Sequence, residues 1–348
     1  MKAIELFSGA GGMSQGASIA GVEVAWAIEK DPWCAATYAH NHPQTTVVNA
    51  DVRSIDAGRF RQRRRLDLVF GGPPCQGFST SNQRTRTKAN KANWLFREFL
   101  RMVSTLNPRW VVFENVRGIV DTEKGYFFRQ IQRGLRTLGY SVTSAILNAG
   151  DFGVPQTRWR TFVVAGPETA RFRFPAPSAG RRPTVRDAIF DLPILLNGST
   201  HEGPLKYRAP AQSEYAAHLR GRLRSTSNHI VTNNAPYVAR RFSQVPPGGN
   251  WKDIPELAES ARGRGPHSGL YRRLTWDHSS VVIGNFRKNM LIHPDQDRGL
   301  SVREAARLQS FHDGYRFLGT IGFQQQQVAN AVPPLLAAAV FSAILAVD

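Results

Sequence analysis

Short apolar segments alternate with longer stretches of mixed polarity through the first half of the chain. The short segments are typical of buried strands, and helical candidates lie between them. Seven strands are expected at residues 3–7, 22–28, 45–49, 66–70, 109–113, 141–147 and 161–165, with helices at 32–39, 94–106 and 127–138. This alternation predicts an α/β fold with a doubly wound, mostly parallel sheet.

The pattern changes near residue 174, where proline, glycine and arginine become frequent and no period is sustained. Short strand-like pieces such as 280–283 remain, so we predict a second, smaller, irregular β-rich domain. Two helical stretches follow, at 302–309 and 324–346. We therefore expect a first domain over 1–174, a second domain over 175–315, and a return over 316–348 that completes the first domain.

The length of 348 residues allows one large domain and a smaller one. The chain has no run of about 18 apolar residues, and Met1-Lys2 leads directly into the first strand, so we expect neither a membrane span nor a signal peptide. Two cysteines, Cys34 and Cys75, are too few for a disulfide framework or a structural zinc site, and we expect no metal. A reducing cytoplasm fits these features.

The formal net charge of +19 indicates a polyanionic partner. Lysine and arginine gain affinity for nucleic acids because they release counterions condensed on the phosphates. Net charge bears on partners and solubility rather than on fold, so the function has to be argued from a site.

Cys75 lies in the run Gly-Gly-Pro-Pro-Cys-Gln-Gly-Phe-Ser at 71–79, directly after the predicted strand 66–70. Open α/β sheets build their sites at the carboxyl ends of strands. The glycines allow close approach of a ligand and the prolines stiffen the turn, which suits a nucleophile held in one orientation. The alternative is a proline-rich turn with a buried thiol. Cys34 lies on a predicted helix without such neighbours, and we expect it to be a small buried apolar group.

A glycine-rich loop, Phe-Ser-Gly-Ala-Gly-Gly at 7–12, follows the first predicted strand. Backbone N–H groups in such a turn can hold an anion, and a dinucleotide phosphate is the usual ligand. The spacing is Phe-x-Gly-x-Gly rather than Gly-x-Gly-x-x-Gly, so the pattern does not match the dinucleotide fingerprint. Glu29 and Asp51 come after the second and third predicted strands, at the same edge of the sheet.

Further blocks follow in a fixed order: Glu-Asn-Val at 114–116, Gln-Thr-Arg-Trp-Arg at 156–160, and the runs 303–309 and 327–334. Together with 7–12 and 71–79, these blocks resemble the DNA (cytosine-5)-methyltransferase family of the bacterial restriction-modification type. The resemblance covers nearly the whole chain except about 175–297. Ser301 and Glu304 form a capping-box pattern, and we expect the helix that follows to be mostly structural.

The resemblance implies S-adenosylmethionine as cofactor, with its methionine carboxylate at the glycine loop. The residues implied for this site are Phe7, Gly9, Gly11, Glu29, Asp51 and Asn330. Glu29 is implied to accept hydrogen bonds from the ribose hydroxyls, and Asp51 from the adenine amino group. Structural alternatives are a core aromatic at Phe7, ordinary strand-end carboxylates, and a helix cap at Asn330. Family members often have an apolar or aromatic residue at Lys30, so the residue that stacks on adenine is left open.

Carbon 5 of cytosine is a poor nucleophile, and the resemblance implies that Cys75 adds to carbon 6 to form an enamine. Glu114 is implied to protonate or hydrogen-bond N3, which requires a raised pKa such as burial would give. Arg158 and Arg160 are implied to face the base O2 and the flanking phosphate and to favour the Cys75 thiolate. The alternative for these arginines is a surface strand edge beside Gln156. No side chain is identified for removal of the carbon-5 proton, and water is an option.

A base inside a duplex cannot meet Cys75 unless it is flipped out, so we expect the loop after Cys75 to close over DNA. A solvated loop is the alternative. The expected DNA-binding residues are Gln76, Ser79, Arg84, Arg86 and Lys88 in this loop, and Arg240, Arg241, Arg272 and Arg273 in the second domain. Residues 90–94 lack the acidic residues common in the family, which puts the closure contacts in doubt. We expect the second domain to recognise the target sequence, with arginines that read guanine or hold phosphates.

The sequence thus predicts a monomeric DNA (cytosine-5)-methyltransferase that acts on duplex DNA in the cytoplasm, in association with the nucleoid. A restriction endonuclease that acts separately is a partner that this role allows. Three alternatives were weighed: an RNA methyltransferase of the same chemistry, a dinucleotide-dependent oxidoreductase and an inactive DNA-binding regulator. The long arginine-rich insert disfavours the first, and Cys75 and Glu114 disfavour the other two.

Overall fold

The computed structural model describes residues 1–61, 66–74, 87, 89–201, 203–261 and 269–348, and it divides them into two compact units. Unit 1 consists of Met1–Phe152, Trp159–Ser178 and Pro334–Asp348, and unit 2 of Gly153–Arg158 and Ala179–Pro333. The first boundary falls at residue 178 rather than 174, and the return to unit 1 begins at 334 rather than 316. The short segment 153–158 also belongs to unit 2, which the sequence analysis did not foresee.

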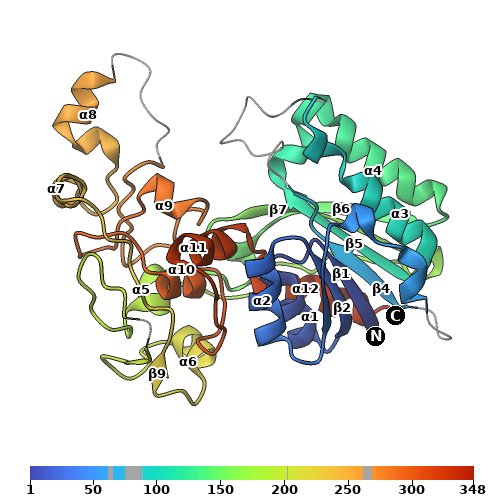
Figure 1. Ribbon diagram of the computed structural model, residues 1–348, viewed down its shortest axis with the longest axis horizontal. Coiled ribbons are helices and arrows are strands. Elements are labelled where there is room, and N and C mark those ends of the chain that lie inside the picture. The colour runs from blue at the N-terminus through green and yellow to red at the C-terminus, as the bar shows by residue number, and fades with distance from the viewer. Residues whose placement is uncertain (62–65, 75–86, 88, 202, 262–268) are drawn as a thin grey trace. The chain divides into compact units, whose positions relative to one another are not determined.

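Unit 1 contains a seven-stranded sheet with the order β3-β2-β1-β4-β5-β7-β6 (Figure 1). The strands are β1 (Lys2–Leu6), β2 (Glu23–Glu29), β3 (Thr46–Asn49), β4 (Leu68–Gly71), β5 (Trp110–Val116), β6 (Ser141–Asn148) and β7 (Trp159–Gly166). The pairs among β1 to β5 are parallel, and β7 pairs antiparallel with both β5 and β6. All seven predicted strands are present, and the predicted α/β fold with a mostly parallel sheet is confirmed.

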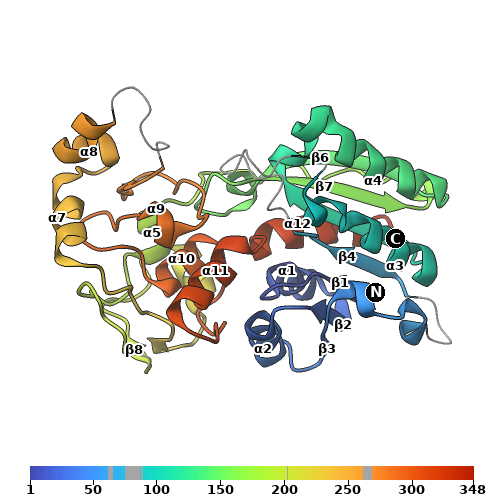
Figure 2. The ribbon, with the colours of Figure 1, turned by 45° about the horizontal axis from the view of Figure 1, so that its top comes forward.

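Helices cover both faces of this sheet (Figure 2). They are α1 (Gly12–Ala20), α2 (Pro32–Asn41), α3 (Phe96–Leu106), α4 (Tyr126–Thr137) and α12 (Pro334–Leu345). On one face, α3 and α4 bury residues such as Phe99 and Ile131 in a cluster with Val69. Since strand side chains alternate between faces, Phe70 points to the other face, where it contacts Phe341 of α12 with ring centroids 5.0 Å apart.

The strand order reverses between β1 and β4, because β1 leads outward to β2 and β4 leads outward to β5. In doubly wound sheets, ligands bind beyond the carboxyl ends of the strands at such a reversal. The loop that follows β1 is the glycine-rich loop, and the residues that follow β4 lead to Cys75. The fold therefore starts both predicted site segments from neighbouring strands.

Unit 2 is built mainly from short helices and irregular segments. Its helices are α5 (Val185–Ile189), α6 (Glu214–Arg220), α7 (Pro236–Gln244), α8 (Pro255–Ser260), α9 (Phe286–Asn289), α10 (Val302–Leu308) and α11 (Ile321–Asn330). The strands found in its described residues are β8 (Leu205–Lys206) and β9 (Ser225–Thr226), so the β-rich prediction is wrong for that part of the chain. The capping box of Ser301 and Glu304 at the start of α10 is confirmed, and every residue of α10 is buried.

The segment Ile321–Leu345 is long and apolar enough to cross a membrane by length and composition alone, and 67% of its most apolar window is buried. The sequence analysis overlooked this stretch because Asn330 and two prolines interrupt the apolar residues. Two helices, α11 and α12, form it, with Ala331–Pro333 between them. Within unit 1, α12 packs so closely on α1 that a Cβ at Gly16 would lie 2.5 Å from Ala337 Cβ. Core helices commonly pass the same test, so the stretch is weak evidence for a span.

Candidate active site

Glu114, near the carboxyl end of β5, forms an ion pair with Arg160 at the start of β7. Arg160 Nε and Glu114 Oε1 are 3.0 Å apart, and the two side chains are 10% and 9% exposed. The register explains the pairing, because Val116 lies opposite Arg160 in this antiparallel ladder. Opposed residues and residues two apart along a strand share a face of the sheet, so Glu114 and Arg160 point to the same side. Two of the predicted catalytic side chains therefore meet.

The segment that leads to Cys75 is fixed to the same end of β5. Asn115 Nδ2 donates a hydrogen bond to the Pro73 carbonyl at 3.0 Å. A Cβ at Gly72 would lie 2.5 Å from Glu114 Oε2, so the Glu114 carboxylate occupies the space that a larger residue would need. Cys75, Gln76, Ser79, Arg84, Arg86 and Lys88 lie outside the described residues, and their roles stay predictions.

Arg158 does not have the surroundings that the resemblance implied. Its side chain is 1% exposed. Nη1 donates to the Ile283 carbonyl at 2.7 Å, and Nη2 donates to the carbonyls of Ala329 and Ala331 at 2.7 and 2.9 Å. Both terminal nitrogens of Arg158 hold backbone carbonyls of unit 2, which indicates a structural role, and its predicted contact with the base stays a prediction. The surface-edge alternative is also wrong, because Gln156 is fully buried as well.

The loop between β1 and α1 has the backbone shape of an anion site. Phe7, Gly9 and Gly11 adopt φ values of 56°, 55° and 87°. No side chain caps α1 and its first turn contains no acidic residue, so the positive end of the helix is left for a ligand. Ser8 Oγ is buried without a hydrogen-bond partner in the described part of the chain, and a Cβ at Gly9 would meet no atom within 4 Å. These features fit a carboxylate such as that of S-adenosylmethionine.

Glu29, at the end of β2, is tied to this loop. Its Oε2 accepts a hydrogen bond from the Gly9 N–H, and its Oε1 accepts one from the Asp31 N–H, both at 2.7 Å. Burial raises the pKa of Glu29 above its ordinary value, and these hydrogen bonds oppose the rise. Because a carboxylate has about four acceptor positions, Glu29 retains capacity for the hydroxyls of a ribose.

Asp51, after β3, lies in a positively charged surrounding. Its carboxylate pairs with Arg53 Nη2 at 2.7 Å and with Lys30 Nζ at 3.3 Å. The hydrogen bond from Arg53 is the main reason that the pKa of Asp51 is lowered, so Asp51 is an acceptor at neutral pH. Lys30, which departs from the family pattern, is thus a partner of Asp51. The adenine contact of Asp51 stays a prediction.

The remaining residues predicted for the cofactor site are less defined. Phe7 is half-buried and packs against the apolar cluster under α3 and α4, so the core alternative holds at least in part. Asn330 is the exposed last residue of α11 in unit 2, and its proposed cofactor contact is untested. Burial and the nearby carboxylates of Glu29 and Asp31 raise the pKa of the Cys34 thiol, which disfavours a thiolate there.

Four arginines of unit 2 were expected to contact DNA, and the structure contradicts this expectation for Arg273. It is 4% exposed, and its guanidinium donates to the carbonyls of Val245 and Phe242 at 2.7 Å each and pairs with Asp297 at 2.5 Å. These donors hold the fold together, so Arg273 does not read a base.

Arg241 and Arg240 are neighbours on α7 with different surroundings. Arg241 pairs with Glu256 at 2.5 Å and lies over the ring of Tyr237, with 5.1 Å between the guanidinium and the ring centroid. Arg240 is exposed, and Arg272 is half-buried. Arg240 is therefore the best placed of the four to contact a nucleic acid, and the DNA contacts of Arg241 and Arg272 stay predictions.

Two residues of the site were missed by the sequence analysis. Gly72 was expected only to allow close approach of a ligand, yet its missing side chain makes room for Glu114. Ser8, inside the glycine loop, was not singled out as a donor. A signal for Ser8 was present, since a hydroxyl residue stands between the two residues predicted to line the cofactor.

Known proteins resemble this chain over almost its whole length. The family model of C-5 cytosine-specific DNA methylases matches residues 1–346. Type II methyltransferase M1.HphI of Haemophilus parahaemolyticus is 38% identical over 350 residues, which cover 98% of this chain and 86% of the relative. Type II methyltransferase M.DdeI of Desulfomicrobium norvegicum is 33% identical over 366 residues, with coverages of 97% and 87%. A solved structure of a DNA modification methyltransferase encoded within a prophage (E. coli) matches with a TM-score of 0.82 at 26% identity, covering 100% of this chain and 99% of that one.

Proposed function

Because the chain belongs to the C-5 cytosine-specific DNA methylase family, we propose that Cys75, Glu114 and Arg160 act together on one cytosine of its DNA substrate. The protein is a DNA (cytosine-5)-methyltransferase, as the sequence predicted. M1.HphI and M.DdeI are type II methyltransferases, which supports a role beside a restriction endonuclease that acts separately. The proposal therefore concerns which residues carry the reaction and how.

The ion pair of Glu114 and Arg160 is the observation that supports this assignment most directly. Both side chains are largely buried at the end of β5, where Gly72 and Pro73 lead to Cys75. A base that enters this position would meet Glu114 with its N3 edge and Arg160 with its O2. Arg160 keeps Glu114 in one orientation and places positive charge where the base gains electron density.

The chemistry follows from the weak nucleophilicity of carbon 5. The Cys75 thiolate adds to carbon 6, and the electron pair of the carbon 5–carbon 6 bond moves into the ring as N3 accepts a proton from Glu114. The ion pair with Arg160 favours the Glu114 carboxylate, so this step requires that the entering base exclude water and bring Glu114 to its protonated form. After carbon 5 has been methylated, carbon 5 loses its proton to a base, Cys75 leaves carbon 6 as the thiolate, and N3 returns its proton to Glu114, which restores the neutral aromatic ring.

The methyl donor that fits the glycine loop is S-adenosylmethionine, which supplies the methyl group for carbon 5. Ser8 and the N-terminal end of α1 would hold its carboxylate. Glu29 would accept from the ribose hydroxyls, and Asp51 would accept from the adenine amino group. Phe7, Gly9 and Gly11 shape the loop, and we keep Asn330 as a proposed contact.

We further infer that the substrate is duplex DNA, that the target base is flipped out, and that unit 2 recognises the sequence around it. The exposed Arg240 on α7 is the side chain of unit 2 that best supports this role. We propose that the enzyme acts as a monomer in the cytoplasm, at the nucleoid, because its substrate is there.

Trapping with a duplex that contains 5-fluorocytosine tests the mechanism. Fluorine cannot leave carbon 5 as a proton does, so a covalent adduct should accumulate and peptide mapping should locate it at Cys75. The Cys75→Ala variant should transfer no methyl group and still bind DNA, whereas the matched Cys34→Ala variant should remain active. An adduct on another residue, or activity in Cys75→Ala, would show that the assignment is wrong.

A further inference from the structure

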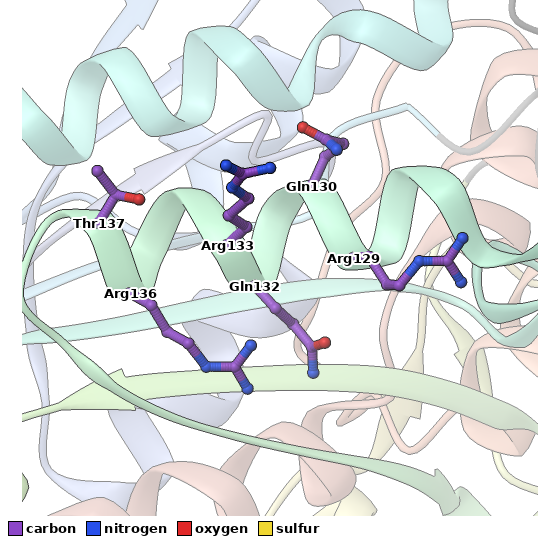
Figure 3. A pocket seen from close by; sticks show the side chains of 6 residues that line it. All are labelled: Arg129, Gln130, Gln132, Arg133, Arg136 and Thr137. Atoms are coloured by element: carbon purple, nitrogen blue, oxygen red, sulfur yellow. The ribbon is translucent and has the colours of Figure 1, made fainter.

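Helix α4 carries a row of arginines that the reaction does not use. Arg129, Arg133 and Arg136 are exposed, and they line a shallow depression of about 510 Å³ together with Gln130, Gln132 and Thr137. Figure 3 shows the guanidinium groups spread over the outer surface of α4, with Arg133 and Arg136 on opposite sides of the helix axis. We call Arg129, Arg133 and Arg136 the α4 arginine face.

The sequence of α4 places these charges at a cost to the helix. Arg129 and Arg133 are four residues apart, and Arg133 and Arg136 are three apart, spacings at which like charges repel. The 12 residues of α4 include no acid. On the neighbouring α3, by contrast, Arg101 pairs with Glu98 at 2.7 Å. Among the described residues no acidic side chain is paired with these three arginines, and Arg129 Nη1 donates to the Lys124 carbonyl at 2.6 Å.

The three arginines follow α4 from the side of the carboxyl end of β5 toward the side of its amino end. Helix α4 follows β5, which ends at Val116 beside Glu114. After α4, the Tyr140 hydroxyl donates to the Pro108 carbonyl at 2.7 Å, just before β5 begins, so the chain has returned to the start of that strand. Arg129 therefore lies toward the end of the sheet that carries Glu114, and Arg136 lies about 10 Å further along the helix.

We propose that the α4 arginine face binds the phosphate backbone of duplex DNA outside the recognised sequence. A polyanion is the occupant that these charges favour, because α4 presents three exposed arginines and no acid in a protein of net charge +19. DNA carries a phosphate about every 3.4 Å of helix axis on each strand, so arginines that extend over about 10 Å of α4 can reach more than one phosphate. Such contacts add affinity and salt dependence without reading sequence. The proposal rests on DNA as the substrate.

The double variant Arg133→Gln/Arg136→Gln tests this proposal, because glutamine keeps the helix propensity and removes both charges. The methylated site is first located by bisulfite sequencing of DNA from cells that express the protein. Binding is then measured over a series of salt concentrations on a short duplex that ends at the site and on a long duplex with extended flanks. On the long duplex the slope of log affinity against log salt should flatten by about two units, and the affinity should fall at least tenfold.

On the short duplex, affinity and single-turnover methylation should equal those of the wild-type protein. The matched control Arg171→Gln/Arg173→Gln removes two exposed arginines of unit 1 elsewhere and should change neither slope. The proposal is overturned if the α4 variant binds the long duplex as wild type does, or if it loses affinity equally on both duplexes. Loss of methylation on the short duplex would instead point to the active-site assignment. A thermal unfolding midpoint at or above that of wild type establishes that the variant is folded.

Discussion

Few charged side chains are buried in the described part of unit 1, and they are mainly Glu5 and the pair of Glu114 and Arg160. In unit 2 the interior itself contains charges: Arg307 is fully buried against Asp191 and Asp313, and Arg298 is buried against Glu304. In unit 1 the backbone groups of the strands are hydrogen-bonded to neighbouring strands. Much of unit 2 is irregular, so its backbone carbonyls need other hydrogen-bond donors. Arginine supplies five donors in one side chain, so it replaces the missing ladders. The number of arginines in unit 2 therefore overestimates the number of arginines that can contact DNA.

Among the charged residues compared between the two units, Glu114 near the carboxyl end of β5 should have the largest effect on activity. Glu114→Gln keeps the volume but removes the acid, and we expect the single-turnover rate to fall by about 10²- to 10⁴-fold, the usual contribution of general acid catalysis. Cofactor affinity should stay close to that of wild type. Glu98→Gln is the matched control, because it also removes a carboxylate that pairs with an arginine at about the same distance, but on α3. A wild-type rate in Glu114→Gln would place the proton transfer elsewhere.

A buried charge of unit 2 should affect stability rather than chemistry. Arg307→Met leaves Asp191 and Asp313 without their cation, and breaking such a buried pair costs about 3–5 kcal/mol. Urea unfolding measures this loss, and the exposed Arg222→Met serves as control, with an expected change within about 0.5 kcal/mol. Equal stability of the two variants would remove the contrast between the units.

Glu5 on β1 is a buried carboxyl of unit 1, 2% exposed, with Ser14 of α1 and Tyr38 of α2 as its hydrogen-bond partners. Burial raises the pKa of Glu5 to about 8, against the hydrogen bonds of Ser14 and Tyr38. The folded protein thus holds a proton that the unfolded chain releases above about pH 4.3. Its contribution to stability is complete below that pH and is lost as the pH rises toward 8.

Glu5→Gln carries no titratable group and should therefore gain stability relative to wild type between pH 5 and 8, by up to about 1.4 kcal/mol for each pH unit. Unfolding free energies at several pH values measure the gain. For the exposed Glu23→Gln control, the plot of unfolding free energy against pH should be parallel to that of wild type. If the plot for Glu5→Gln is also parallel to that of wild type, Glu5 is ionised in the folded protein over this pH range.

The smallest expected effect concerns Arg240, the exposed arginine of α7. Arg240→Gln should change the unfolding free energy by less than about 0.5 kcal/mol. It should weaken DNA binding, either by about one unit of salt slope for a phosphate contact or by about 1–3 kcal/mol on the recognised site for a base contact. Arg273→Gln should show the reverse, a loss of stability through its backbone contacts. Binding and unfolding measurements on both variants decide between the roles, and the assignment fails if Arg240→Gln binds DNA normally.

The sheet and its edge were predictable from sequence because both depend on local patterns. Apolar runs and glycine turns marked all seven strands, and the same turns marked the loop at Gly9. The partners of buried arginines were not predictable. Arg158 donates to carbonyls 125, 171 and 173 residues away along the chain, and nothing in its own neighbourhood shows whether it faces a base or a carbonyl. The same holds for Arg273, whose acceptors lie on other segments of unit 2.

The division of the chain at Arg158 and Trp159 matters for anyone who exchanges specificity between related enzymes. Unit 2 consists of two segments, 153–158 and 179–333, and Arg158 from the first holds carbonyls of the second. In a chimera that replaces only 179–333, the Arg158 guanidinium of this protein would have to bind backbone carbonyls of the other enzyme. If unit 2 recognises the sequence, as we propose, the segment to exchange is bipartite, with crossovers after Phe152, Arg158, Ser178 and Pro333, so that Arg158 moves with its acceptors while Arg160 stays with Glu114.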